Sequence, residues 1–179
     1  TNLITFLKSH ELAEARKRGA DLERELNKVI PTFIKRNRIN SQVREIDDKM
    51  KELAKEYFAS MRPTSDHVTL LPAADFIDEV VTSALFPYAQ ISALQILGEV
   101  KQMPLDKKKH IISVYTGKRE SRRDRTGRGL EAGYPLTFDF VGGFAEYRDL
   151  ERHRILTQQR QDLTVAFGFI MPPEMSAIG

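Results

Sequence analysis

The sequence Ala145-Glu-Tyr-Arg-Asp-Leu-Glu-Arg-His-Arg-Ile-Leu-Thr-Gln-Gln-Arg160 contains the element around which we expect the rest of the chain to be arranged. We predict a helix that ends in the triplet Arg152-His153-Arg154. In the preceding segment, Leu136-Thr-Phe-Asp-Phe140, apolar and polar residues alternate, which predicts a half-buried strand. Gly142-Gly143 then turns the chain. The sequence therefore predicts a strand, a turn and a helix with a cationic end.

The triplet places three cationic or cation-capable side chains at the predicted helix end, where they could hold a phosphate. Basic residues are also favoured near helix C-termini, so a solvated helix end explains the same pattern. On the helix, Arg148 and Arg152 would lie one turn apart and repel each other by a few tenths of a kcal/mol, in the range of about 0.2–0.5 kcal/mol. We expect two pairs to compensate for this repulsion: Glu151 with Arg154, and Asp149 with His153.

A second basic segment, Gly117–Glu131, precedes the strand and is punctuated by three glycines. The guanidinium fork of arginine suits phosphate, and glycine lets backbone amides approach an anion. The segment closes with no Gly-Lys-Ser/Thr, and no strand leads directly into it, so it is neither a Walker loop nor a Rossmann fingerprint. We predict an anion or phosphate site there; a surface loop without a ligand is the alternative. The candidate residues are Arg122, Arg123, Arg125 and Arg128.

The first third of the chain is predicted to be helical. One helix should cover residues 9–38, kinked or broken at Pro31, and a second should run from Ser41 to about Met61. Each carries an apolar stripe at helical spacing, which predicts packing in a core. Arg62-Pro-Thr64 interrupts the helical pattern, and the character of the sequence changes after it. We therefore divide the chain into a helical segment, residues 1–62, and an α+β domain, residues 63–179.

Within the second part we expect a short strand over residues 67–71 and then three helices, over residues 75–86, 92–102 and 104–115. The fold class predicted from the sequence is therefore α+β, with N-terminal helices followed by a small sheet flanked by helices.

The composition excludes several kinds of chemistry. The 179 residues include no cysteine, which excludes disulfides, thiolate zinc sites and thiol nucleophiles and fits a cytoplasmic protein. No apolar run approaches the roughly 20 residues that cross a bilayer. The four histidines lack metal-ligand spacing, so we predict no metal site. The net charge of +3 is mild, and residues 119–128 lack the interleaved aromatics of a single-strand binder, so nucleic acid is not the expected partner. Any chemistry must come from an external cofactor.

The triplet region resembles the flavin-dependent thymidylate synthase (ThyX) family. That family carries Arg-His-Arg, then Ser three residues on, and then Asn/Gln-Glu-x-Ser-x-Arg-Tyr, after a Phe-x-Phe strand. Here Phe138-Asp-Phe140 precedes Arg152-His153-Arg154-Ile-Leu-Thr157-Gln-Gln159. The resemblance implies a flavoprotein of nucleotide biosynthesis that binds FAD at a subunit interface. Such a methyltransferase uses NADPH and methylenetetrahydrofolate to convert dUMP to dTMP. It also implies cofactor binding by Arg152, His153, Arg154, Thr157 and Gln159.

The second half of the family motif does not match. Arg160 replaces the family's Glu, Asp162 its nucleotide-binding Ser, and Thr164 its substrate-binding Arg; Asp149 replaces a Gln before the triplet. Carboxylates at 149 and 162 would oppose a nucleotide phosphate. We therefore assign no catalytic residue and expect weak or no thymidylate synthase activity from this chain alone.

A closer resemblance is to the C-terminal unit of a long, two-copy ThyX-like family. The matching residues begin near residue 22; they are Val29–Phe33, Leu85–Tyr88, Tyr115–Gly117, Arg122-Arg123, Gly127-Arg128 and Tyr147–Thr157. This implies a diverged ThyX-like unit of a longer protein, incomplete at its C-terminus. Its expected partners are a nucleotide or flavin, and either a homo-oligomer or an intact N-terminal half. The alternative function is a non-catalytic scaffolding or oligomerisation lobe.

Overall fold

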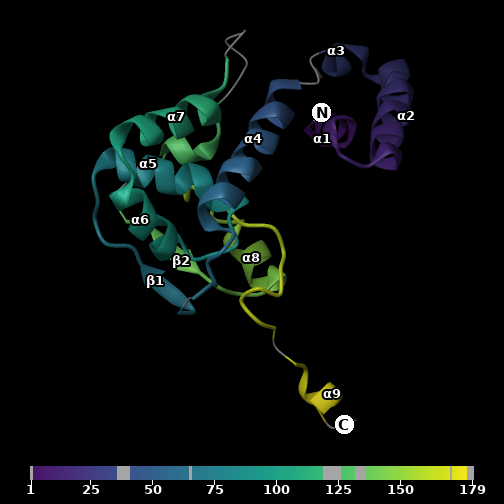
Figure 1. Ribbon diagram of the computed structural model, residues 1–179. Helices are drawn as coiled ribbons and strands as arrows, with labels where there is room; N and C mark the ends of the chain where they lie inside the picture. The colour runs from purple at the N-terminus through teal and green to yellow at the C-terminus, as the bar shows by residue number, and fades with distance from the viewer. Residues whose placement is uncertain are drawn as a thin grey trace. The chain divides into compact units, whose positions relative to one another are not determined.

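The computed structural model describes residues 2–35, 41–64, 66–118, 126–131, 136–169 and 171–176 (Figure 1). The described chain is mostly helical and contains a two-stranded antiparallel sheet, which confirms the α+β class. The elements are α1 (Asn2–Ser9), α2 (Ala13–Val29), α3 (Pro31–Ile34), α4 (Ser41–Phe58), β1 (Val68–Leu70), α5 (Phe76–Leu85), η1 (Phe86–Tyr88), α6 (Ala93–Gln102), α7 (Leu105–Thr116), η2 (Arg128–Glu131), β2 (Phe138–Phe140), α8 (Phe144–Leu150) and α9 (Pro173–Ser176).

The described residues form two compact units. Unit 1 holds those of Thr1–Asp48 and Lys118–Asp124, and unit 2 holds those of Lys49–Gly117 and Arg125–Gly179. The domain division at residue 62, made from the sequence, stays a prediction. Every candidate residue for which the structure gives a position lies in unit 2.

Unit 1 is built on close contact between α1 and α2. At Gly19 of α2, an added Cβ would lie 2.9 Å from both the Cβ of Leu7 and the backbone N of Lys8, so the two helices can approach this closely only at a glycine. Ile4 of α1 is buried, and Lys8 forms an ion pair with Glu23 of α2. The helix hairpin is thus held by one tight backbone approach and one partly buried ion pair.

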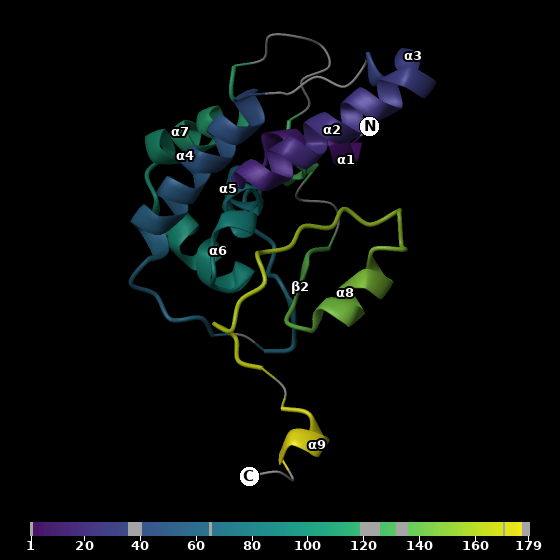
Figure 2. The ribbon, with the colours of Figure 1, turned by 90° about the vertical axis from the view of Figure 1, so that its right-hand side faces the viewer.

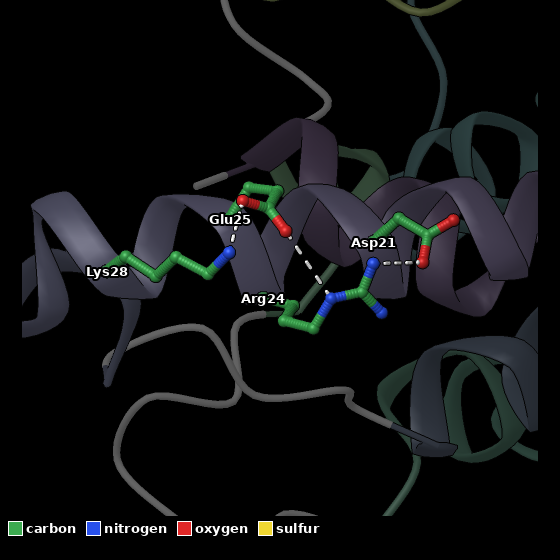
Figure 3. Close-up of polar contacts among 4 residues, drawn as sticks. All are labelled: Asp21, Arg24, Glu25 and Lys28. Carbon is green, nitrogen blue, oxygen red and sulfur yellow. Dashed lines mark hydrogen bonds and ion pairs between the residues drawn. The ribbon is translucent and has the colours of Figure 1, made fainter.

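The helix break predicted at Pro31 is confirmed, because α2 ends at Val29 and α3 begins at Pro31. The prediction that the apolar stripe beside it belongs to a core is wrong at Val29 and Phe33, which are exposed, and correct at Ile34. The outer surface of α2 instead carries a chain of ion pairs, in which Arg24 bonds Asp21 and Glu25, and Lys28 bonds Glu25 (Figure 3). Exposed pairs of this kind contribute little to stability.

Unit 2 has its core around α5, which packs against α6, α7 and η2 (Figure 1). Ser92 and Gln95 form a capping box that starts α6. Asp78 of α5 accepts a 2.6 Å hydrogen bond from Lys108 of α7, and both side chains are nearly buried. The fully buried apolar residues of unit 2 include Met50, Val81, Ala84, Leu85, Ile96, Val100 and Ile111.

The two predicted strands pair with each other, but in β2 the polar residue of the alternating pattern is buried and the apolar residues are exposed. Asp139 is buried, with 6% of its surface exposed, whereas Phe138 and Phe140 are about half exposed. The reason lies in α6, because the backbone N–H of Ala93 in its first turn donates a 2.8 Å hydrogen bond to Oδ2 of Asp139. A helix N-terminus has free N–H groups and favours a carboxylate. That interaction turns the aspartate inward and the phenylalanines outward.

Candidate anion site after helix α8

The predicted helix through the triplet is wrong in its length. Helix α8 ends at Leu150, so the Arg152-His153-Arg154 triplet lies in a turn beyond it (Figure 2). The amide N–H groups of Arg152 and His153 bond carbonyls only three residues back, at Asp149 and Leu150. The side-chain amide of Gln158 also donates to the Leu150 carbonyl, at 2.6 Å. A side chain eight residues further along the chain thus bonds the carbonyl with which the helix would have continued.

The triplet turn, residues 152–154, is open to solvent. Arg152 makes one ion pair, with Asp149, at 3.4 Å, and the two side chains are 80% and 75% exposed. The predicted pairing of Asp149 with His153 is therefore replaced by an Asp149–Arg152 pair. Glu151, expected to pair with Arg154, accepts a 3.2 Å hydrogen bond from the Tyr147 hydroxyl instead. Within the described part of the chain, no hydrogen bond or ion pair engages the side chain of His153 or Arg154.

The residues that follow, Thr157–Gln161, form what we call the polar strap. This irregular segment bonds to several elements of unit 2. The Thr157 hydroxyl donates to Glu131 of η2 at 2.8 Å, and Gln159 accepts from the Ser83 hydroxyl of α5 at 2.6 Å. Gln161 donates to the Ile91 carbonyl at 2.8 Å, just before α6. The two predicted cofactor ligands in this strap, Thr157 and Gln159, are thus already hydrogen-bonded within the protein, and their cofactor role stays a prediction.

Arg160 of the strap lies over the ring of Tyr147 in α8, with its guanidinium carbon 5.6 Å from the ring centroid. Burial raises the pKa of the Tyr147 hydroxyl, and the nearby Glu151 carboxylate raises this pKa further, while the Arg160 charge acts in the opposite direction. This stacking holds the strap against α8. Arg160 is therefore in contact with an aromatic ring.

Arg128 is the candidate residue of the basic loop whose position the structure describes; Arg122, Arg123 and Arg125 lie outside the described residues. Arg128 is exposed at the start of η2, between two glycines that pack against Tyr115. A Cβ on Gly127 would lie 2.1 Å from the Tyr115 hydroxyl oxygen, and that oxygen accepts a 2.9 Å hydrogen bond from the Gly129 N–H. The expectation that these glycines expose amides to an anion is wrong for Gly129, whose amide bonds to Tyr115.

The contact between Thr157 and Glu131 connects the two predicted anion-binding segments. Glu131 ends η2, which begins at Arg128, and Thr157 lies three residues after the triplet turn. Sequence reasoning did not single out the residues that make these connections. Glu131 is the last residue of the predicted basic segment, and Ser83 and Tyr147 lie in predicted helices; their partners are 26, 76 and 13 residues away in the chain.

A shallow, open depression elsewhere in unit 2 is lined by Ala73, Ala74, Asp75, Asp78 and Lys101. Its lining includes none of the predicted site residues. No cluster of three or more His, Cys, Asp or Glu with the geometry of a metal site occurs in the described ranges. None of the described helices is long and apolar enough to span a membrane.

The sequence of this chain is similar to those of proteins from two Chlamydia species and from Thermoplasma acidophilum. A UPF0159 protein of Chlamydia pneumoniae is 35% identical over 184 residues, which cover 97% of this chain and 34% of that protein. A UPF0159 protein of Chlamydia muridarum is 29% identical over 97% of this chain and 35% of its own length. One from Thermoplasma acidophilum is 27% identical over 96% of this chain and 34% of its own length. The chain therefore spans about a third of the length of the curated relatives it matches. The names of these relatives state no activity or ligand. No family model and no solved structure matches the chain.

Proposed function

We propose that this chain is a diverged, cytoplasmic ThyX-like unit of a longer protein related to FAD-dependent thymidylate synthase. In this proposal the triplet turn contacts the diphosphate of FAD. The observation that carries it is the availability of the triplet, because Arg152 has one long, exposed ion pair and the His153 and Arg154 side chains have no partner within the described residues. Guanidinium groups bind phosphate oxygens through paired, charge-assisted hydrogen bonds.

The side chains present fit one part of FAD better than another. The cations at 152 and 154 suit a diphosphate, and Arg128, tied to the same region through η2 and the strap, adds a further cation. The strap residues Thr157 and Gln159 are engaged by Glu131 and Ser83, so they would have to exchange partners to reach a ligand. When bound, FAD would supply the redox chemistry. This chain would contribute electrostatic contact with its phosphates.

The chain alone should not complete the reaction. Asp162 stands where the resemblance implies a nucleotide-binding serine, and Arg160 lies over the ring of Tyr147. We therefore expect no measurable conversion of dUMP to dTMP by the isolated chain. Residues from the remainder of a longer protein would have to supply the substrate site.

A flavin titration tests the proposal. Quenching of FAD fluorescence should saturate with the wild-type chain, and the double variant R152A/R154A should bind at least about tenfold more weakly, a loss of about 1.4 kcal/mol. Arg148→Ala is the matched control, because Arg148 is an exposed arginine on α8 one turn before the triplet. Equal binding by the wild type and the double variant would contradict the triplet contact. Absence of FAD uptake by the wild-type chain would contradict flavin binding altogether.

A second candidate function, a non-catalytic scaffolding lobe, is supported by the polar strap. Its hydrogen bonds hold Thr157 and Gln159 within the protein, as expected where a former ligand site has become structural. This candidate predicts a stable assembly that binds no FAD. The same titration, run beside light scattering, separates the two functions.

A further inference from the structure

The side-chain amide of Gln158 bonds a carbonyl that would otherwise draw the triplet into helix α8. In a continuing α-helix the Leu150 carbonyl would accept the amide N–H of Arg154, four residues on. Here it accepts the Gln158 amide at 2.6 Å and the His153 N–H at 3.0 Å. The Arg154 N–H donates instead to the Arg152 carbonyl, at 3.1 Å. Gln158 therefore occupies the acceptor that a longer helix would offer to the last residue of the triplet.

The turn and a longer helix would present the two arginines of the triplet differently. Residues two apart in an α-helix are separated by about 200° around its axis, so their side chains do not face each other. Arg152 and Arg154 would then lie on opposite faces, and one diphosphate could not meet both. In the structure, the bond between their backbones closes a tight turn whose end residues come together, and both side chains are exposed. The turn thus allows both guanidinium groups to approach one anion.

The stability of the fold alone does not account for Gln158. A carbonyl only accepts hydrogen bonds, so the NH2 group of the Gln158 amide must face Leu150. The amide oxygen, Oε1, is then buried, and no donor from the described part of the chain meets it. A buried acceptor without a donor is unfavourable for folding. Residues that break such a rule are found most often at functional sites.

We propose that Gln158 is a positioning residue for the anion site. By ending α8 at Leu150, it holds Arg152 and Arg154 in a turn from which both bind the same diphosphate. In this role it contacts the backbone of α8 and not the ligand. The other bonds of the polar strap reach η2, α5 and the residue before Ser92, so they do not restrain Leu150. This inference rests on the proposed function, because it takes the triplet turn as the contact with FAD.

A flavin titration of Gln158→Met tests the inference. Methionine keeps the length and neutral charge of glutamine but has no N–H, so α8 can extend through the triplet. FAD should bind Q158M at least about tenfold more weakly than the wild type. The Cα chemical shifts of residues 151–154 should also become helical. Gln161→Met is the matched control, because it removes a 2.8 Å bond from the same strap to the Ile91 carbonyl, and it should leave both measurements unchanged.

A second background separates this role from a general loosening of the strap. Proline lacks an N–H and disfavours a helical backbone at the residue before it. Ile155 is 98% exposed, and its N–H has no partner among the described residues, so Ile155→Pro blocks the longer helix and removes little else. In this background, adding Gln158→Met should change the affinity for FAD by less than about twofold, because the helix cannot extend.

Each other outcome overturns the inference. FAD binding that Q158M leaves unchanged rejects it and leaves the proposed function in place, as does the absence of helical shifts at residues 151–154. Equal weakening by Q158M and Q161M, or an undiminished effect of Q158M in the I155P background, assigns the effect to the strap as a whole. Absence of FAD uptake by the wild type rejects the proposed function, and this inference with it. Circular dichroism checks that each variant is folded, and Gln158→Ala replaces Q158M if that variant unfolds.

Discussion

The triplet turn and the polar strap are neighbours in the chain, yet they differ in how the protein uses their polar groups. The triplet turn has one weak ion pair, whereas the strap is hydrogen-bonded to η2, α8 and α5. A polar group with a partner inside the protein contributes to stability, while an exposed cation without one is available to a ligand. The comparison separates a structural segment from a candidate binding segment, and it is open to direct test.

The largest expected effect concerns η2, to which the strap is bonded. A Cβ at Gly129 would lie 2.9 Å from the backbone of Ala84 in α5, so Gly129→Ala should lower the free energy of unfolding by about 1–3 kcal/mol through overpacking. Urea denaturation measures this change. Gly98→Ala is the control, because nothing lies within 4 Å of its added Cβ inside helix α6, and this change should stabilise the protein. If both substitutions changed the free energy of unfolding equally, the idea that η2 anchors the strap would be wrong.

The next effect concerns the strap itself. Ser83→Ala removes the donor that bonds Gln159 in a partly buried contact, and it should cost about 0.5–1.5 kcal/mol of unfolding free energy. Gln159→Ala should cost a similar amount, and the double variant should cost less than the sum, because both remove one shared bond. Full additivity in urea denaturation would show that the bond contributes nothing to stability.

A smaller effect, dependent on pH, extends the comparison to a buried carboxylate. Burial raises the pKa of Asp139, although the amides of Ala93 and Phe140 act to lower it. A raised pKa means that the folded state binds the proton more tightly, so this residue's contribution to stability falls as pH rises from its ordinary pKa through its raised one. Asp139→Asn keeps an acceptor for Ala93 and should remove this contribution.

The measurement for Asp139 is the difference in unfolding free energy between D139N and the wild type from pH 3 to neutrality. The free energy of unfolding of D139N, relative to that of the wild type, should increase as the pH rises from the ordinary pKa of Asp139 through its raised pKa. A difference that is constant with pH, or that favours the wild type at higher pH, would contradict a raised pKa.

The smallest expected effect is at the triplet. Arg152→Ala breaks only an exposed ion pair with Asp149 and should change the free energy of unfolding by less than about 0.5 kcal/mol. The same variant should weaken FAD binding if the proposed function holds. A loss of stability comparable to that of Ser83→Ala would remove the distinction between turn and strap.

The sequence predicted the helices of unit 2 well where local signals mark their ends. Asp75 and Ser92 precede the starts of α5 and α6, and Pro87 and Pro104 follow their ends, so the predicted bounds fall within about two residues of the observed ones. The two strands were also located correctly. Such local signals depend on neighbouring residues alone, which is why a sequence reveals them.

The predictions were wrong where a residue outside the local sequence pattern determines the structure. The faces of β2 were reversed because α6 supplies the partner of Asp139, and no pattern within residues 136–140 shows this. The helix after Gly143 was predicted too long because the amide of Gln158 takes the carbonyl of Leu150. The sequence singled out the triplet as a cationic cluster, but the strap could not be recognised, since its partners come from four separate segments.

The contact between Tyr115 and the Gly127–Gly129 turn has a consequence for how this sequence can change over evolution. The tyrosine hydroxyl fills the space that side chains at 127 and 129 would need, and it supplies the acceptor for the amide at 129. Neither position can mutate alone without a clash or an unsatisfied amide. We expect relatives that lose Gly127 to carry a smaller residue at 115, whereas Gly129 should remain a glycine, because the backbone of Ala84 also lies 2.9 Å from its added Cβ.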